Sequence, residues 1–124
     1  MIGLNARTSV YAYCLPVDMR KGFEGLSALV REQLGRDPLD GALYLFTNRR
    51  RTRAKVLCFD GSGLSVYSKR LERERFVALW KCTKHESIAL TKTELELFLQ
   101  GSHLIARFQL APEPMSEKDL AVQS

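Results

Sequence analysis

Two short basic runs carry the strongest chemical signal in this chain of 124 residues. They lie within residues 49–55 and 69–75, and together they hold nine of the nineteen lysines and arginines. Their members are Arg49, Arg50, Arg51, Arg53, Lys55, Lys69, Arg70, Arg73 and Arg75. A guanidinium group pairs bidentately with phosphate oxygens, so clustered arginines suit a phosphate-rich partner.

The positive charge is concentrated in this window and is not spread over the whole surface. Residues 49–75 include only three acidic residues, so the window carries a net charge of +6 while the whole chain carries +5. Such a patch would bind a nucleic-acid backbone or an acidic protein face, because charge alone does not separate the two. The alternative is a solvated face that keeps the protein soluble. Glu72 and Glu74 would then form local ion pairs, each contributing well under about 1 kcal/mol.

The sequence contains no recognisable catalytic or metal-binding motif. Polynucleotide chemistry with two metals needs several converging carboxylates. Asp18, Asp60 and Glu94 are instead explained locally, as a helix cap, a turn residue and a capping-box member. The two histidines, His85 and His103, have no partner at the spacing of a metal motif. We therefore expect no enzymatic activity, no metal and no cofactor.

Composition and cysteine usage indicate a small globular protein of the cytoplasm. The apolar fraction of 45% and the charged fraction of 27% are ordinary for a folded domain. No apolar stretch approaches the roughly 18 residues of a membrane span, and the first residues lack the layout of a secretory signal. The three cysteines, Cys14, Cys58 and Cys82, are odd in number and widely spaced. We expect them to be reduced and unpaired.

The elements that must position the basic runs form an α+β fold, a single compact domain over residues 1–110. Strand-type residues predict strands at 10–15, 43–47, 54–59 and 64–69, the last three as an antiparallel meander. Residues 76–80 and 87–90 resemble a further hairpin. Residues 111–124 look like a flexible polar C-terminal tail. The sheet is expected to be mostly antiparallel.

Two main helices should pack on this sheet. Apolar spacing predicts the first over 19–34, capped by Asp18 and closed by Gly35. Gly22 and Gly25 inside it cost helix stability and suggest a close approach of the sheet backbone. The second helix is predicted over 92–100, where Thr91 and Glu94 have the spacing of a capping box.

Hairpin pairing brings the two basic runs together. A turn at residues 60–63 places Arg53 opposite Arg70, at the end of the hairpin away from the turn and roughly 20 Å from it. Opposed like charges repel unless an anion offsets them. This geometry favours a functional anion-binding patch. Tyr67 could stack on a base or, alternatively, pack across the strands.

Four runs occur together in an order and spacing that resemble a known family. They are DMRKGFEGL at 18–26, DGSGL at 60–64, KRLER with Phe76 at 69–76, and LTKTEL at 90–95 with Gly101. The chain resembles, over roughly residues 1–110, the TnpB accessory protein of bacterial insertion sequences of the insertion-sequence-66 type, also described as second-open-reading-frame-like. Two departures concern aromatic residues: Cys58 and Phe59 stand where the family often has a tryptophan pair, and residues 77–80 replace its usual tryptophan-proline.

The resemblance implies a small protein encoded beside a separate transposase, which carries the catalytic acids of the mobile element. We therefore expect a non-catalytic accessory protein of transposition and DNA recombination. It would bind DNA, in particular the element ends, through the nine basic residues named above. The alternative is an adaptor that binds the transposase of the same element without contacting DNA. No membrane partner is expected.

Overall fold

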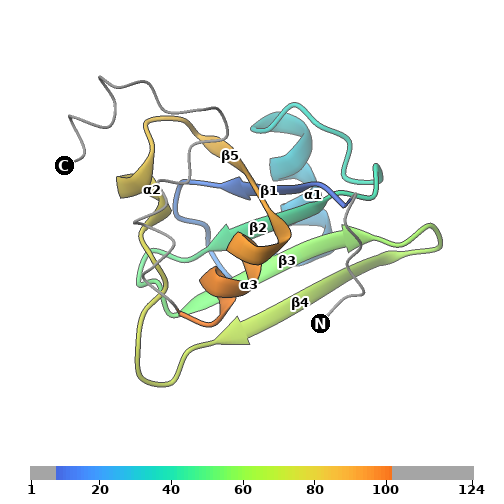
Figure 1. The fold of residues 1–124 in the computed structure, drawn as a ribbon. Coiled ribbons are helices and arrows are strands. Elements are labelled where there is room, and N and C mark those ends of the chain that lie inside the picture. The colour runs from blue at the N-terminus through green and yellow to red at the C-terminus, as the bar shows by residue number, and fades with distance from the viewer. Residues whose placement is uncertain (1–7, 102–124) are drawn as a thin grey trace.

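A computed structural model describes residues 8–101 and has a five-stranded sheet with helices on both faces (Figure 1). The strand order is β4-β3-β2-β1-β5. The strands are β1 (Val10–Tyr13), β2 (Leu43–Thr47), β3 (Arg53–Phe59), β4 (Leu64–Arg70) and β5 (Ser87–Leu90). The helices are α1 (Phe23–Glu32), α2 (Leu79–Cys82) and α3 (Lys92–Leu99). The predicted α+β class is confirmed, whereas the predicted tail at 111–124 lies outside the described residues.

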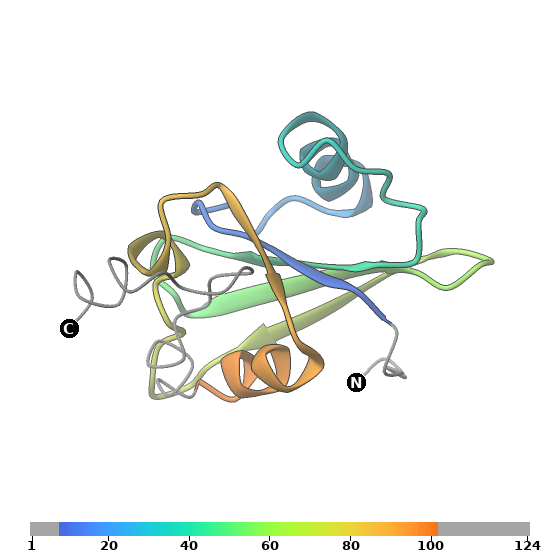
Figure 2. The same ribbon diagram turned by 45° about the horizontal axis from the view of Figure 1, so that its top comes forward.

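The helix α1 connects β1 and β2, which are the one parallel pair among the described strands, and it covers one face of the sheet. Figure 2 shows α1 on one side of the sheet and α3 on the other. Leu26 and Val30 of α1 are fully buried and pack with Tyr44 and Phe46 of β2 and with Leu57 of β3. Alternate residues of the strands therefore supply this layer of the core.

The opposite face holds the larger part of the core. Leu95, Phe98 and Leu99 of α3 are buried there. Phe76, which follows β4, stacks on Phe98 with ring centroids 5.0 Å apart. The β4–β5 connection therefore fills the space beside α3. Among the described helices, none has the length and apolar content that crossing a membrane requires.

The meander and α3 agree with the sequence prediction. The strands β2, β3 and β4 pair antiparallel, with Phe59 opposite Leu64 at the turn. Thr91 caps α3: its hydroxyl accepts the backbone N–H of Glu94 at 3.1 Å, and the Glu94 carboxylate accepts that of Thr91 at 2.8 Å. Gly101 follows the helix with φ of +78°, a backbone conformation that favours glycine.

The start of α1 differs from its prediction. The helix begins at Phe23, and its N-cap is Gly22, which has no side chain to cap it. Asp18 is not a helix cap, because its carboxylate binds the backbone N–H and the guanidinium of Arg20. The preceding chain is held by the sheet, since Val17 N–H donates to the carbonyl of Thr47 at 2.9 Å.

Two further expectations were wrong. No backbone approaches the helix glycines: a Cβ at Gly22 would meet nothing within 4 Å, and one at Gly25 would meet the side chain of Lys21. Residues 76–80 do not form a hairpin with 87–90, because β5 pairs with β1. The apolar residues Phe76 and Leu79 are fully buried in the core, so burial rather than strand pairing accounts for that run.

Candidate nucleic-acid interface

Three connections leave the sheet at the same end. The strands β1, β2 and β4 finish there, and β3 and β5 begin there, as their pairing requires (Figure 1, left). The connections are residues 14–22, 48–52 and 71–86. With the adjoining strand ends at 53–55 and 69–70, we call this surface the basic end.

The basic end gathers most of the cations of the whole chain. Thirteen of the nineteen basic residues of the chain lie at this end, whereas four of the fourteen acidic residues of the chain do. Besides the nine predicted residues, the cations are Arg20, Lys21, Lys81 and Lys84, and the acids are Asp18, Glu72, Glu74 and Glu86. Such a one-sided distribution produces a positive potential at one end of the molecule.

The pairing of β3 with β4 is the predicted one. Arg53 lies opposite Arg70, and Lys55 lies opposite Ser68. The acidic turn at Asp60 closes the other end of this hairpin, where its carboxylate accepts the backbone N–H groups of Ser62 and Gly63. These hydrogen bonds lower the pKa of Asp60, so its negative charge is fixed at the far end.

The turn between β2 and β3 presents the first arginine run. The amide oxygen of Asn48 accepts the backbone N–H groups of Thr52 and Arg53 at 2.9 and 3.0 Å. Arg51 has φ of +62° and is half-buried, whereas Arg49 and Arg50 are exposed. Asparagine therefore fixes the turn by side-chain hydrogen bonds, and two guanidinium groups extend from it into solvent.

This turn is bonded to the segment that carries the second arginine run. The carbonyl of Thr52 accepts the N–H of Leu71 at 2.8 Å, and the carbonyl of Arg51 accepts that of Phe76 at 2.7 Å. Arg73 and Arg75, both exposed, lie between these two points. The two runs are therefore neighbours in the fold, although about twenty residues separate them in the sequence.

Strand alternation divides the predicted cations between the two faces of the sheet. Ala54 and Tyr67 belong to the layer on the α3 side, so Lys69, which pairs with Ala54, lies on that side. Arg53, Lys55 and Arg70 lie on the α1 side. Lys69 is thus separated from its neighbours in the sequence. Tyr67 packs against the core, which accounts for its ring.

A segment that the sequence reasoning did not include completes the α1 side. The ammonium group of Lys55 donates to the carbonyl of Lys21 at 2.8 Å, so residues 14–22 are held against β3. Arg20 and Lys21 thereby join the basic end. Both stand in the sequence run 18–26, but only the fold shows that this run approaches β3.

Arg20 already has a partner. Its guanidinium contacts the Asp18 carboxylate at 2.7 Å, and 91% of the Arg20 side chain is exposed. Side-chain and backbone hydrogen bonds from Arg20 lower the pKa of Asp18 to about 2. The helix α1 also starts here, so the positive end of its dipole adds to the field, while Glu24 in its first turn opposes it.

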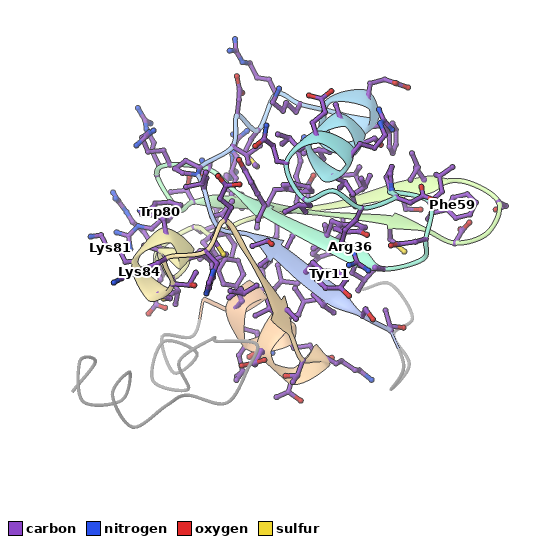
Figure 3. All side chains as sticks on the ribbon, turned by 90° about the horizontal axis from the view of Figure 1, so that it is seen from above. Tyr11, Arg36, Phe59, Trp80, Lys81 and Lys84 are labelled. Atoms are coloured by element: carbon purple, nitrogen blue, oxygen red, sulfur yellow. The ribbon has the colours of Figure 1, made fainter. Side chains whose placement is uncertain are left out.

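Lys81 and Lys84 were also missed by sequence reasoning. They flank Cys82 in the β4–β5 connection, and Figure 3 shows both with Trp80 at the end of the molecule opposite Phe59. No charge run marks them in the sequence. Residues 76–80 lead into α2 and not into a strand, and this path of the chain places both lysines at the basic end.

A separate polar cluster at the other end of the sheet has a structural role. The guanidinium of Arg36 lies 4.0 Å from the ring centroid of Tyr11 and donates to the Tyr44 hydroxyl at 3.3 Å. That hydroxyl donates to Asp40 at 2.8 Å. Burial, aided by Asp40, raises the pKa of Tyr44 to about 12. Figure 3 shows Arg36 beside Tyr11, and these contacts fasten residues 33–42 to the sheet.

The described residues contain three free thiols and no cluster of metal ligands. Between residues 8 and 101, no three His, Cys, Asp or Glu side chains group closely enough to hold a metal ion. The three cysteines are free thiols, as predicted, and Cys14 and Cys58 are buried. Burial raises the pKa of Cys14 to about 12 and raises those of Cys58 and Cys82 as well.

Comparison with known proteins identifies similar sequences. A family model described as IS66 Orf2 like protein matches residues 8–108. The chain is similar to the uncharacterized protein y4hO of Sinorhizobium fredii, with 40% identity over 84 residues, which are 68% of this chain and 71% of that one. It is also similar to the uncharacterized protein y4jC of the same organism, with 32% identity over 101 residues, or 82% and 85% of the two chains. No solved structure matches.

Proposed function

The chain belongs to the IS66 Orf2-like family, and on that premise we propose that it is a DNA-binding, non-catalytic accessory protein of transposition. Family membership supports the accessory role in transposition. The proposal goes beyond family membership in one respect, which is direct contact with DNA, in particular with the ends of the element. It would take place in the bacterial cytoplasm, beside the separate transposase of the same element.

One observation carries the proposal: thirteen of nineteen basic residues occupy one end of the sheet. Keeping so many like charges together opposes folding unless an anion neutralises them. The exposed guanidinium groups of Arg49, Arg50, Arg73 and Arg75 make no ion pair within residues 8–101. They remain available for phosphate oxygens, which arginine binds in a bidentate manner.

A non-catalytic role agrees with the positions of the acids. Asp18 is engaged by Arg20, Asp60 by the β3–β4 turn, and Glu94 by the cap of α3. Each carboxylate thus has a local structural role, and the three lie on different elements. A metal-dependent nuclease instead needs carboxylates that converge on the same ions. We infer that bond breakage belongs to the transposase.

The test is duplex binding by the purified protein over a range of salt concentrations. Neutralising a phosphate releases counterions, so the logarithm of the binding constant should fall linearly with the logarithm of salt, by about 0.9 per contact. We expect binding to element ends and to unrelated duplexes alike, and no cleavage when Mg²⁺ is added. Absence of binding at low salt would overturn the DNA proposal, and Mg²⁺-dependent cleavage would overturn the non-catalytic one.

A second candidate, the protein adaptor, rests on two apolar side chains, one in the segment before α1 and one at the first residue of α1. Leu15 is 39% exposed and Phe23 is 50% exposed, and the stretch 15–23 between them also contains the cations Arg20 and Lys21. An acidic protein with apolar side chains would match this surface. Co-purification with the transposase that resists salt, without retardation of DNA in a gel, would favour the adaptor.

A further inference from the structure

We propose that the basic end binds DNA with unpaired bases, and that Trp80 supplies the ring on which a base stacks. This inference rests on the proposed DNA binding and specifies the form of the nucleic acid. Trp80 is the only tryptophan of the chain, and it lies in α2 between the second arginine run and β5. Its neighbours Lys81 and Lys84 are exposed.

The packing of α2 turns Trp80 away from the core. Leu79 is fully buried, and Cys82 packs against the same core cluster, so these two positions define the inner side of the helical turn. Trp80 is half-buried and Lys81 exposed. Figure 3 shows Trp80, Lys81 and Lys84 gathered at the outer edge of the molecule. The indole thus has a supported side and an accessible side.

The connection that carries the ring is bonded to other parts of the fold on both sides of α2. Before α2, Phe76 N–H donates to the carbonyl of Arg51 at 2.7 Å; after it, Cys14 N–H donates to the carbonyl of Glu86 at 2.7 Å. The connection is therefore held at Phe76, before Trp80, and at Glu86, after it. A ring held in this way loses little conformational freedom when a base stacks on it, which favours binding.

Within the described part of the chain, four aromatic side chains make no ring contact, namely Trp80, Tyr67, Phe23 and Phe59, and of these four Trp80 alone lies in the basic end. Tyr11 stacks on Tyr44 and is covered by Arg36, and Phe76 stacks on Phe98. Tyr67 packs against the core. At the basic end, Trp80 is thus the aromatic side chain with a face left to a ligand.

Aromatic rings flanked by cations are typical of proteins that bind single strands. A base that has lost its neighbours exposes its π-face, which stacks on indole, while lysines neutralise the adjoining phosphates. In an intact duplex each base face is covered by the next base pair. The ring on α2 therefore favours unpaired DNA, whereas the arginine turn at 48–52 contributes to both forms.

Tryptophan fluorescence provides a direct test, because Trp80 is the single tryptophan of the chain. The probes are a short oligo-dT strand and a blunt duplex of the same length. We expect oligo-dT to quench the emission in a saturable manner and the duplex to bind with little quenching. Trp80→Ala should weaken oligo-dT binding at least about fivefold, measured by anisotropy of a labelled strand, and change duplex binding less than about twofold.

Two further variants keep the test decisive. Trp80→Phe preserves a ring and should retain most of the oligo-dT affinity even if the alanine variant folds poorly. Phe59→Ala removes an aromatic side chain at the far end and should leave quenching unchanged. Equal quenching by both DNAs, or unchanged oligo-dT affinity in a folded Trp80→Ala variant, would overturn the inference while leaving DNA binding intact. Failure of the wild-type protein to bind either DNA would overturn both.

Discussion

Single cations at the basic end differ in whether they already have a partner. Arg20 pairs with Asp18, Arg70 pairs with Glu72 at 2.9 Å, and Lys55 donates to a backbone carbonyl. Such exposed pairs contribute little to stability. They do reduce the charge left for a ligand. Within residues 8–101, Arg49 and Arg50, like Arg73 and Arg75, are exposed and form no ion pair, and because they are adjacent they are the first residues to substitute.

The thiols allow a prediction at the same scale. Because their pKa values are raised, the three cysteines carry less thiolate at pH 8 than a free cysteine does, and Cys14, with a pKa of about 12, carries the least. Because the thiolate is the nucleophile, native Cys14 should react with iodoacetamide at least about tenfold more slowly than in urea. The half-buried Cys82 should react first. Mass spectrometry of digested samples measures both, and equally fast native labelling of Cys14 would contradict the burial described here.

At the residue scale, the sequence predicts those contacts that the pairing of a hairpin determines. The juxtaposition of Arg53 with Arg70 follows from the turn at 60–63, because a hairpin fixes its own register. The bond from Lys55 to Lys21 joins positions 34 apart in the sequence, so no local pattern indicates it. Strand alternation could have shown that Lys69 faces away from Arg53. Arg53 pairs with Arg70, and Lys69 is the next residue along β4, so its side chain lies on the other face of the sheet.

At the scale of elements, prediction succeeded where capping and turn chemistry are explicit. The capping box of α3 and the meander of β2, β3 and β4 were found from side chains within a few residues of one another. The start of α1 was misplaced because Asp18 has a competing partner, Arg20, two residues away. The prediction of a strand at 76–80 was wrong because a short apolar segment is compatible either with a strand or with a buried segment that has no regular secondary structure.

The cap of α3 gives the prediction for this scale. Thr91→Ala removes the hydroxyl that accepts the Glu94 N–H, and should lower the free energy of unfolding by about 1 kcal/mol. Thr93→Ala is the matched control, since Thr93 is exposed within the same helix and alanine has the higher helix propensity. Urea unfolding followed by circular dichroism compares the two variants. Equal stability of the two would show that the cap contributes nothing.

For the whole molecule, the sheet topology determines where the charge gathers. Three connections that are distant in the sequence, 14–22, 48–52 and 71–86, leave the sheet at one end because β1 and β2 are parallel and the other pairs antiparallel. The sequence showed two of the basic runs. The addition of residues 20–21 and 81–84 could not be predicted, since it depends on the order of the strands.

The salt dependence of duplex binding in a charge-matched pair of variants tests the central claim most directly. Arg49→Ala with Arg50→Ala removes two exposed cations from the basic end, and leaves Arg51, whose carbonyl binds Phe76. Arg31→Ala with Lys92→Ala removes two exposed cations from the ends of α1 and α3 away from it.

Both variants change the net charge equally, so any difference between them reports position. If the basic end binds phosphates, the first variant should bind many duplexes more weakly and lose up to about 1.8 from the salt slope, about 0.9 per contact. The second should match the wild-type slope. Equal slopes and equal affinities in the two folded variants would contradict DNA binding through the basic end.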